Sequence, residues 1–240
     1  MRRRQAYKLT PSHDVVSAAQ PASLLGFSVR RAYMKRRWFP VVPGTAAIGV
    51  AVATAKGRGH DLDVRLFRKV NGNGGRSADL FFKGVTEFGS IWASVGAAFM
   101  IIRLGRRREA LDALGAASAM WALGQALKRI VLRPRPYVAL ERLRLLIREP
   151  RGTTWPSSHP AVLLTFVSVA TRDLGAPPAG KAGIVALAGV VGLSRVYLGV
   201  HFPADVAGGL LLGRGVADLW SSFVSPSVLR RLPDVSAPLQ

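Results

Sequence analysis

Apolar segments alternate with clusters of arginine and lysine along most of this chain, and this alternation limits the folds that it can adopt. Hydrophobic residues make up 49% of the 240 residues, although the chain also carries 34 lysines and arginines and a formal net charge of +21. A basic nucleic-acid-binding protein would place such charge on an otherwise polar surface. Apolar segments separated by basic loops are instead typical of a protein that crosses a membrane several times.

Six apolar segments predict an all-α fold, a polytopic membrane protein in which about six transmembrane helices form a bundle. Charged or Gly/Pro-rich breaks separate them, and a polar loop is expected between the first two. Glycine and alanine recur in the third, fifth and sixth segments, which would let helix backbones approach closely. The segments are residues 39–55, 82–104, 110–127, 160–171, 182–198 and 203–224.

The expected domains are a basic N-terminal tail (1–38), a six-helix membrane domain (39–224) and a C-terminal tail (225–240). The N-terminal tail holds nine lysines and arginines, and the basic turn 106–108 would lie on the same side two crossings later. Short loops rich in lysine and arginine tend to lie in the cytoplasm. The first loop, which faces the other side, carries six of these residues. The tail is therefore expected in the cytoplasm, either partly on the membrane surface or disordered.

The chain has no cysteine, which excludes disulfides, thiolate metal sites and cysteine nucleophiles. It has only four histidines, at positions 13, 60, 159 and 201, so a metal site built mainly from imidazole would lack ligands. No metal and no cofactor are expected.

Three short stretches carry the polar residues of most interest. They are residues 128–136 after the third apolar segment, 156–159 before the fourth, and 194–205 between the fifth and sixth. An even number of crossings separates the first two stretches from the third. All three therefore open on one membrane face, and the topology predicts a single site at the helix ends.

These stretches read Lys-x6-Arg-Pro, Pro-Ser-Ser-His and Ser-Arg-x5-His-x3-Asp. In order and spacing they resemble the motifs of the type 2 phosphatidic acid phosphatase superfamily, which includes bacterial membrane lipid phosphatases, glucose-6-phosphatase and the vanadium haloperoxidases. The resemblance covers residues 61–224. One position departs from the family pattern, because Ser158 stands where glycine is usual. Serine disfavours the positive φ that glycine allows. With a negative φ, the N–H of Ser158 can still face the site, so the substitution is expected to adjust the site without inactivating it.

Cleaving a phosphate ester without a metal needs cations around the phosphate oxygens, a nucleophile and a proton donor. Lys128, Arg135 and Arg195 supply the positive charge, and arginine contacts phosphate in bidentate fashion. Ser157 and Ser158 add neutral donors at the start of a helix, whose first helical residue is expected to be Pro160.

The resemblance implies that His201 is the nucleophile and forms a phosphohistidine. His159 would protonate the leaving oxygen and then activate water. Asp205 lies four residues after His201, in a helix expected to begin at Pro203, and would accept a hydrogen bond from one ring nitrogen. The other ring nitrogen would then face phosphorus.

The resemblance and this chemistry predict a metal-independent phosphatase that hydrolyses a lipid phosphomonoester or diphosphate, of the prenyl or glycerolipid class. Its partners would be a phosphorylated lipid and the membrane, with no nucleic acid. The basic loop 129–155 interleaves arginines with leucines, so it would lie in the interface where lipids arrive, or be a solvated linker. The expected location is the bacterial cell membrane, with the site facing outward.

Two other functions remain open on the sequence. The phosphoryl group could pass from His201 to an alcohol, which would make the protein a phosphotransferase. A basic membrane scaffold without catalysis would tolerate substitution of His201. The haloperoxidases fit less well because they are soluble, and the sequence leaves the oligomeric state open.

Overall fold

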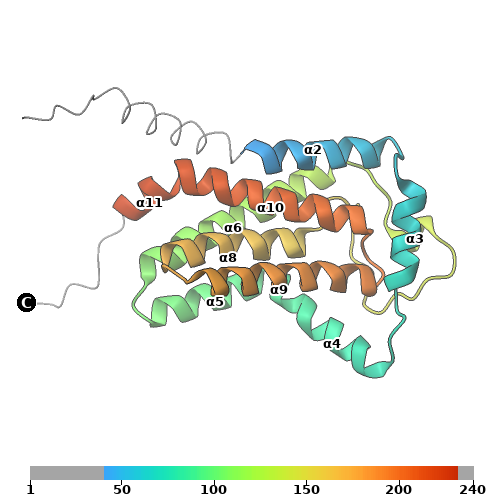
Figure 1. The fold of residues 1–240 in the computed structure, drawn as a ribbon, viewed down its shortest axis with the longest axis horizontal. Coiled ribbons are helices and arrows are strands. Elements are labelled where there is room, and N and C mark those ends of the chain that lie inside the picture. Colours follow the sequence, from blue (N-terminus) through green and yellow to red (C-terminus); the bar gives the residue numbers. More distant parts are fainter. Residues whose placement is uncertain (1–40, 232–240) are drawn as a thin grey trace, which may run out of the picture. The chain divides into compact units, whose positions relative to one another are not determined.

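The computed structural model describes residues 41–231, and all regular structure in this range is helical (Figure 1). The all-α prediction is confirmed for this range. The predicted tails lie largely or wholly outside it. The elements are α2 (Val41–Ala55), α3 (His60–Val70), α4 (Arg76–Thr86), the 3-10 turn η1 (Glu87–Gly89), α5 (Ile91–Arg103), α6 (Arg107–Lys128), α7 (Pro136–Ala139), α8 (Ser158–Asp173), α9 (Pro178–Tyr197), α10 (Pro203–Phe223) and α11 (Ser225–Arg231).

Each of the six apolar segments forms a helix or a helix pair, but few of these helices are both long and apolar. Within residues 41–231, α9 alone passes as a single membrane-crossing helix, and α4 with α5 passes as a bent pair. Helices α6 and α10 have 22 and 21 residues. At 1.5 Å per residue they are about 32 Å long, enough for a hydrocarbon core of roughly 30 Å. Charged residues along both helices lower their hydropathy.

The second predicted helix is interrupted. Residues 82–104 do not form one helix, because η1 separates α4 from α5 and the chain bends by 65°. The Ser90 hydroxyl accepts a hydrogen bond from the Ala93 N–H at 3.0 Å and so caps the start of α5. Gly89 packs against α8 here, where an added Cβ would lie 2.7 Å from the Cβ of His159. The break thus brings η1 against the start of α8.

Two further expectations about helix bounds are wrong. The predicted polar loop between the first two segments contains α3 and most of α4. Helix α3 begins at His60, with acidic residues in its first turn and basic residues in its last, an arrangement that favours the helix dipole. Helix α8 begins at Ser158, so Pro160 is its third residue. Helix α10 does begin at Pro203, as predicted.

Helix α8 is the centre of the bundle, where α6, α9 and α10 pack around it (Figure 1). Val162 and Phe166 lie in one core cluster with Ala117 and Met120 of α6. Small residues bring α10 very close to α8, because a Cβ on Gly209 would lie 2.4 Å from the Ser157 carbonyl oxygen. This agrees with the expected role of glycine in helix packing, and it fixes the start of α8 against α10.

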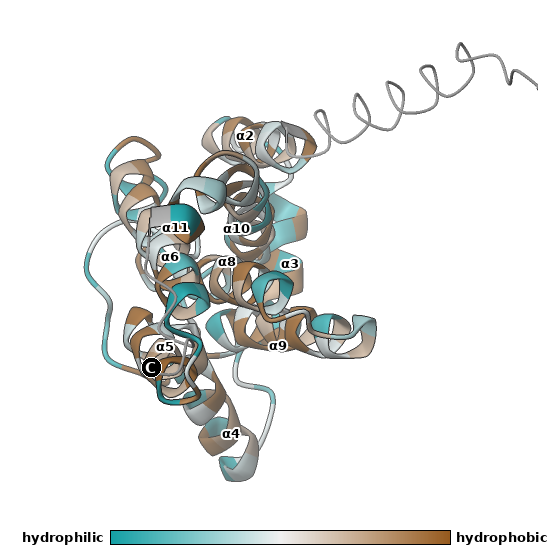
Figure 2. Ribbon diagram, turned by 90° about the vertical axis from the view of Figure 1, so that its left-hand side faces the viewer, coloured by the Kyte–Doolittle hydropathy of each residue, from teal (hydrophilic) through white to brown (hydrophobic). Residues whose placement is uncertain are grey.

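Large apolar side chains are exposed on the outer faces of the helices. On α5, Trp92 is 77% exposed and Phe99 is 59% exposed, and Phe223 at the end of α10 is 67% exposed. Figure 2 shows hydrophobic residues along the outer helices α4 and α9. Soluble proteins rarely expose large contiguous apolar surfaces, whereas lipid-facing helices require them. The outer surface is that of a membrane protein.

Candidate active site

The three predicted stretches meet at one end of the bundle, where α6 and α9 end and α8 and α10 begin (Figure 1). The Thr153 hydroxyl donates to the Lys128 carbonyl oxygen at 2.5 Å, which ties the loop before α8 to the end of α6. The Ser157 N–H donates to the Asp205 carbonyl oxygen at 3.0 Å, and the His201 N–H donates to that of Arg195 at 3.2 Å. The three stretches therefore lie together in one cluster.

Arg135 forms part of the wall of the site, beside His201. Its side chain is only 3% exposed, and it donates to the carbonyl oxygens of Gly152 at 2.9 Å and Val200 at 3.0 Å. One guanidinium nitrogen lies 3.5 Å from Nε2 of His201. Since backbone carbonyls fix the guanidinium, its position does not depend on a bound phosphate.

His201 is a buried, neutral imidazole in the loop between α9 and α10. Burial lowers its pKa well below the usual value, and the charges of Lys128, Arg135 and Arg195 lower this pKa further. Its exposed fraction is 2%. A neutral ring has one nitrogen with a free lone pair, which a nucleophile needs.

Asp205 does not hydrogen-bond directly to His201, so that prediction is wrong. The gap between Nδ1 of His201 and Oδ2 of Asp205 is 3.7 Å. The hydroxyl of Thr154 lies between them, 3.1 Å from Nδ1, and donates to Oδ2 at 2.6 Å. Because that hydroxyl gives its proton to Asp205, it accepts from Nδ1–H, and this leaves the lone pair on Nε2 beside Arg135.

An ion-pair network fixes the position of Asp205. Arg133 lies 2.7 Å from Oδ1 of Asp205 and 2.5 Å from Oδ2 of Asp63 on α3. Asp63 also accepts from the Ala204 N–H at 2.9 Å, at the start of α10. The Arg133 guanidinium lies 4.4 Å from the centre of the Phe202 ring. A single sequence gives no signal for this pairing, because α3 is distant along the chain.

Arg195 and His159 lie on the side of the site that faces η1. Arg195 is 4% exposed and donates to the Thr86 hydroxyl at 3.0 Å. His159 has Arg195, His201, Lys128 and Arg135 as electrostatic neighbours, so both histidines share one set of cations. Thr86, like Thr154 and Arg133, is not among the predicted residues.

Several buried donors at the site have no hydrogen-bond partner within residues 41–231. They include Nε of Arg195 and the hydroxyls of Ser157 and Ser158. Buried polar groups normally have partners, so unpaired donors beside three cations are suited to binding an anion. Ser158 keeps a negative φ, and its hydroxyl packs close to α6, where a Cβ on Gly124 would lie 3.1 Å from it. Within the described residues, no group of three or more His, Asp or Glu side chains gathers as metal ligands.

A family model, the PAP2 superfamily, matches residues 109–228. The chain belongs to this superfamily. The matched range contains all eight predicted site residues together with Thr154 and Arg133. Asp63 and Thr86 lie outside this range, although both contact the site.

Two curated PAP2 relatives match most of their own length. An undecaprenyl-diphosphatase from Sulfolobus acidocaldarius is 29% identical over 170 residues, which cover 70% of this chain and 78% of the relative. A decaprenylphosphoryl-5-phosphoribose phosphatase from Mycobacterium tuberculosis is 31% identical over 143 residues, 58% of this chain and 77% of the relative.

Two solved structures have the same fold. Aquifex aeolicus LpxE is 27% identical with a TM-score of 0.62, over 68% of this chain and 96% of that one. A transmembrane PAP2-type phosphatidylglycerolphosphate phosphatase from Bacillus subtilis has a TM-score of 0.66, over 78% of this chain and 96% of that one. At 23% identity, the second comparison concerns the fold alone.

Proposed function

We propose that this protein is an integral membrane phosphatase that removes phosphate from a lipid through a phosphohistidine at His201. The observation that carries the proposal is the state of this side chain. It is buried and neutral, its Nδ1 is held by Thr154, and its Nε2 lies beside Arg135. This is the arrangement that attack on a phosphate requires.

In the first step, Lys128, Arg135, Arg195 and Ser157 bind the phosphate oxygens and offset their charge. The Nε2 lone pair of His201 forms a bond to phosphorus while the bond from phosphorus to the leaving oxygen breaks. The bound phosphate dianion offsets the cations around His159, so that His159 carries a second ring proton, which it gives to the leaving oxygen as it becomes neutral. The phosphorylated imidazole keeps its Nδ1–H, which the Thr154 hydroxyl and the Asp205 carboxylate stabilise.

In the second step, neutral His159 takes a proton from water as the water oxygen attacks phosphorus. The bond from phosphorus to Nε2 then breaks, which releases inorganic phosphate and restores neutral His201. The proton gained by His159 resets the site. None of the residues used here needs a metal, so we propose a metal-independent hydrolase.

The proposed substrate is a prenyl phosphate or diphosphate, including sugar-linked forms, with glycerolipid phosphates as the other class. The names of both curated relatives concern prenyl lipids, which supports the first class. At the site end, Ile130 is 72% exposed, Leu132 is 73% exposed and Val138 is 70% exposed. These apolar side chains flank Lys128 and Arg135 in the sequence, so a lipid tail in the bilayer could lie beside the phosphate site.

The basic loop before α8 is not a solvated linker. Leu140 and Leu143 pack against the cluster of Phe67 and Phe202, which removes them from the interface proposed for them. Arg144 pairs with Asp79 of α4 at 3.0 Å and donates to the Gly72 carbonyl oxygen. The loop is therefore docked on α3 and α4.

The proposed location is a bacterial cell membrane, with the site outward, the tail in the cytoplasm and no nucleic-acid partner. The test is phosphate release by purified protein from a panel: prenyl mono- and diphosphates, phosphatidic acid, phosphatidylglycerol phosphate and a soluble sugar phosphate. We expect lipid turnover that persists in EDTA and is absent in His201→Ala. Transfer of phosphate to an added alcohol in preference to water would identify a phosphotransferase, and no release from any lipid would contradict the proposal.

A further inference from the structure

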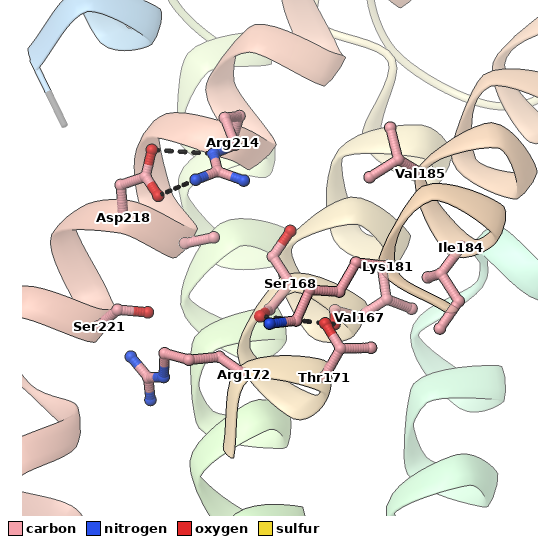
Figure 3. Close-up of a pocket in the computed structure, with 11 residues that line it drawn as sticks. Val167, Ser168, Thr171, Arg172, Lys181, Ile184, Val185, Arg214, Asp218 and Ser221 are labelled. Carbon is pink, nitrogen blue, oxygen red and sulfur yellow. Dashed lines mark hydrogen bonds and ion pairs between the residues drawn. The ribbon is translucent and has the colours of Figure 1, made fainter. Parts of the chain in front are cut away.

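A second polar pocket lies between α8, α9 and α10, away from the histidines (Figure 3). Its volume is about 250 Å³. Since one water occupies roughly 30 Å³ in the liquid, the pocket can hold a group of several heavy atoms. Its polar lining includes Ser168, Arg172, Lys181, Arg214, Asp218 and Ser221.

The pocket is far from the active site along each of its three helices. In α10, thirteen residues separate Asp205 at the site from Asp218 in the pocket, and in α9 fourteen separate Arg195 from Lys181. At 1.5 Å per residue, both separations are about 20 Å. In α8, Ser168 lies nine positions after His159 and Arg172 lies thirteen positions after it, about 14 and 20 Å along the axis. In a bundle that crosses a bilayer, this places the pocket towards the membrane face opposite the active site.

Some of the charged side chains around the pocket are already held in ion pairs, and others can contact a ligand. Arg214 and Asp218 form a two-bond ion pair at 2.9 and 2.7 Å, the pair expected from their spacing (Figure 3). Arg172 pairs with the buried Asp112 of α6 at 3.1 Å. Lys181 has no ion-pair partner within residues 41–231, and Figure 3 shows its side chain reaching over the pocket. The lining therefore keeps a net positive charge.

The Ser168 hydroxyl adds an unused hydrogen-bonding group. It is buried and has no hydrogen-bond partner among the described residues. Figure 3 places it between Lys181 and the Arg214–Asp218 pair. A buried hydroxyl without a partner costs free energy unless a ligand or water satisfies it. A cation, a hydroxyl and a half-exposed arginine converge on one cavity, which is the chemistry of a phosphate site.

Apolar residues form the other side of the same pocket. Val167, Ile184 and Val185 line it, and Val185 is 50% exposed. Leu219 on α10 follows Asp218 and is 44% exposed. A free phosphate ion would gain nothing from this surface, whereas the glycerol and acyl chains of a lipid would. The combination favours a lipid over a soluble anion.

We propose that this pocket binds the phosphate of an anionic phospholipid from the leaflet opposite the active site. Lys181 and Arg214 contact the phosphate, the Ser168 hydroxyl donates to it, and the acyl chains lie along α9 and α10. The bound lipid would hold three helices that also carry site residues at their other ends. This binding site is separate from the proposed catalytic step and does not require turnover.

The test is native mass spectrometry of the detergent-purified protein with phosphatidylglycerol or phosphatidylcholine of identical acyl chains. We expect a retained phosphatidylglycerol whose affinity falls at least fivefold in Lys181→Gln and in Ser168→Val. The paired variant Arg214→Gln/Asp218→Asn removes that ion pair without leaving one charge unpaired. Arg107→Gln, an exposed arginine at the same end of the bundle, is the matched control and should bind lipid normally.

Hydrolysis of a soluble aryl phosphate by each variant checks that it is folded, because none of these residues lies at the active site. Equal lipid affinity in the wild type and all pocket variants would overturn the proposal. Inorganic phosphate that displaces the lipid at low millimolar concentration would overturn the lipid assignment in favour of a free anion. Equal retention of phosphatidylcholine would overturn the role of the charges.

Discussion

His201 and Asp205 lie 3.7 Å apart between Nδ1 and Oδ2, and the hydroxyl of Thr154 bridges them. Spacing alone suggested a direct contact between a histidine and a carboxylate one helical turn later. His201 instead lies before the first turn of α10, so its ring reaches Asp205 only through a residue from the loop before α8. The orientation of the proposed nucleophile therefore depends on two separate segments of the chain.

Thr154→Val should lower kcat about tenfold to a hundredfold, because it removes the bridge between His201 and Asp205. Oδ2 of Asp205 then lacks one hydrogen-bond donor, which costs about 1–3 kcal/mol. KM should change little, because Thr154 is a positioning residue and has no role in binding phosphate. Steady-state kinetics on a lipid phosphate measures both constants. Thr154→Ser keeps the hydroxyl and should recover most of kcat. If it is as impaired as the valine variant, the methyl group and its packing matter more than the bridge.

His201→Ala should abolish phosphohistidine formation and turnover while the protein stays folded. His159→Ala should lose about 10²–10⁴-fold with a poor alcohol leaving group, because its proposed role is proton transfer. The first-step loss should be much smaller with an activated aryl phosphate, whose leaving oxygen needs no proton. Single-turnover assays on both substrates measure this difference. Equal losses on the two substrates would rule out His159 as the acid.

His201 should remain neutral at pH values where an ordinary histidine, with a pKa of about 6.5, is largely protonated. Burial and three nearby cations lower its pKa, so acidification inactivates the nucleophile only well below that value. Above the lowered pKa, the ring stays neutral and reactive. Nitrogen-15 NMR of labelled histidines should show an Nδ1–H tautomer at pH 6, with His201→Asn assigning the signal. A signal that titrates near 6.5 would contradict this picture.

Arg133→Gln should destabilise the protein by about 3–5 kcal/mol, because it leaves the buried carboxylates of Asp63 and Asp205 without their cation. The side chain of Arg133 is 8% exposed, against 46% for Arg106 in its surface pair with Glu109. Arg106→Gln is therefore the matched control and should cost less than about 1 kcal/mol. Thermal unfolding in detergent compares the two. Similar midpoints would show that the buried network contributes little to stability.

Membrane orientation can be tested directly because the native chain has no thiol. A cysteine at Glu149, in the exposed loop at the site end, should react with an impermeant maleimide in whole cells. A cysteine at Arg107, at the start of α6, should react only after the cells are opened. Labelling of the Arg107 position in intact cells would reverse the proposed topology.

The helices and the position of the site were largely predictable from the sequence. Hydrophobic periodicity and charge breaks marked the helical segments, and the even number of crossings placed the three motif stretches on one face. Helix α3 was missed because it has only eleven residues and five of them are charged, so its mean hydropathy is low. Its stability comes from packing against α9 and α10, which is a tertiary effect.

The supporting residues of the site were not predictable for a related reason. Thr154, Arg133 and Thr86 matter because of what they touch across long sequence separations, and each is of an ordinary type for its local stretch. The break before Ser90 depends on close contact between Gly89 and His159, which no local pattern encodes. Motif spacing identified the residues proposed to act on phosphate. The residues that orient them could be recognised only from the three-dimensional structure.

The contact of Asp63 with both Arg133 and the start of α10 sets a lower limit on the size of the functional unit. A chain shortened to residues 109–228 would keep every proposed catalytic and phosphate-binding side chain. It would lose the carboxylate of Asp63 and the Thr86 hydroxyl that fixes Arg195. Exchanges of the motif-bearing segment between relatives should therefore carry α3 and α4 along with it.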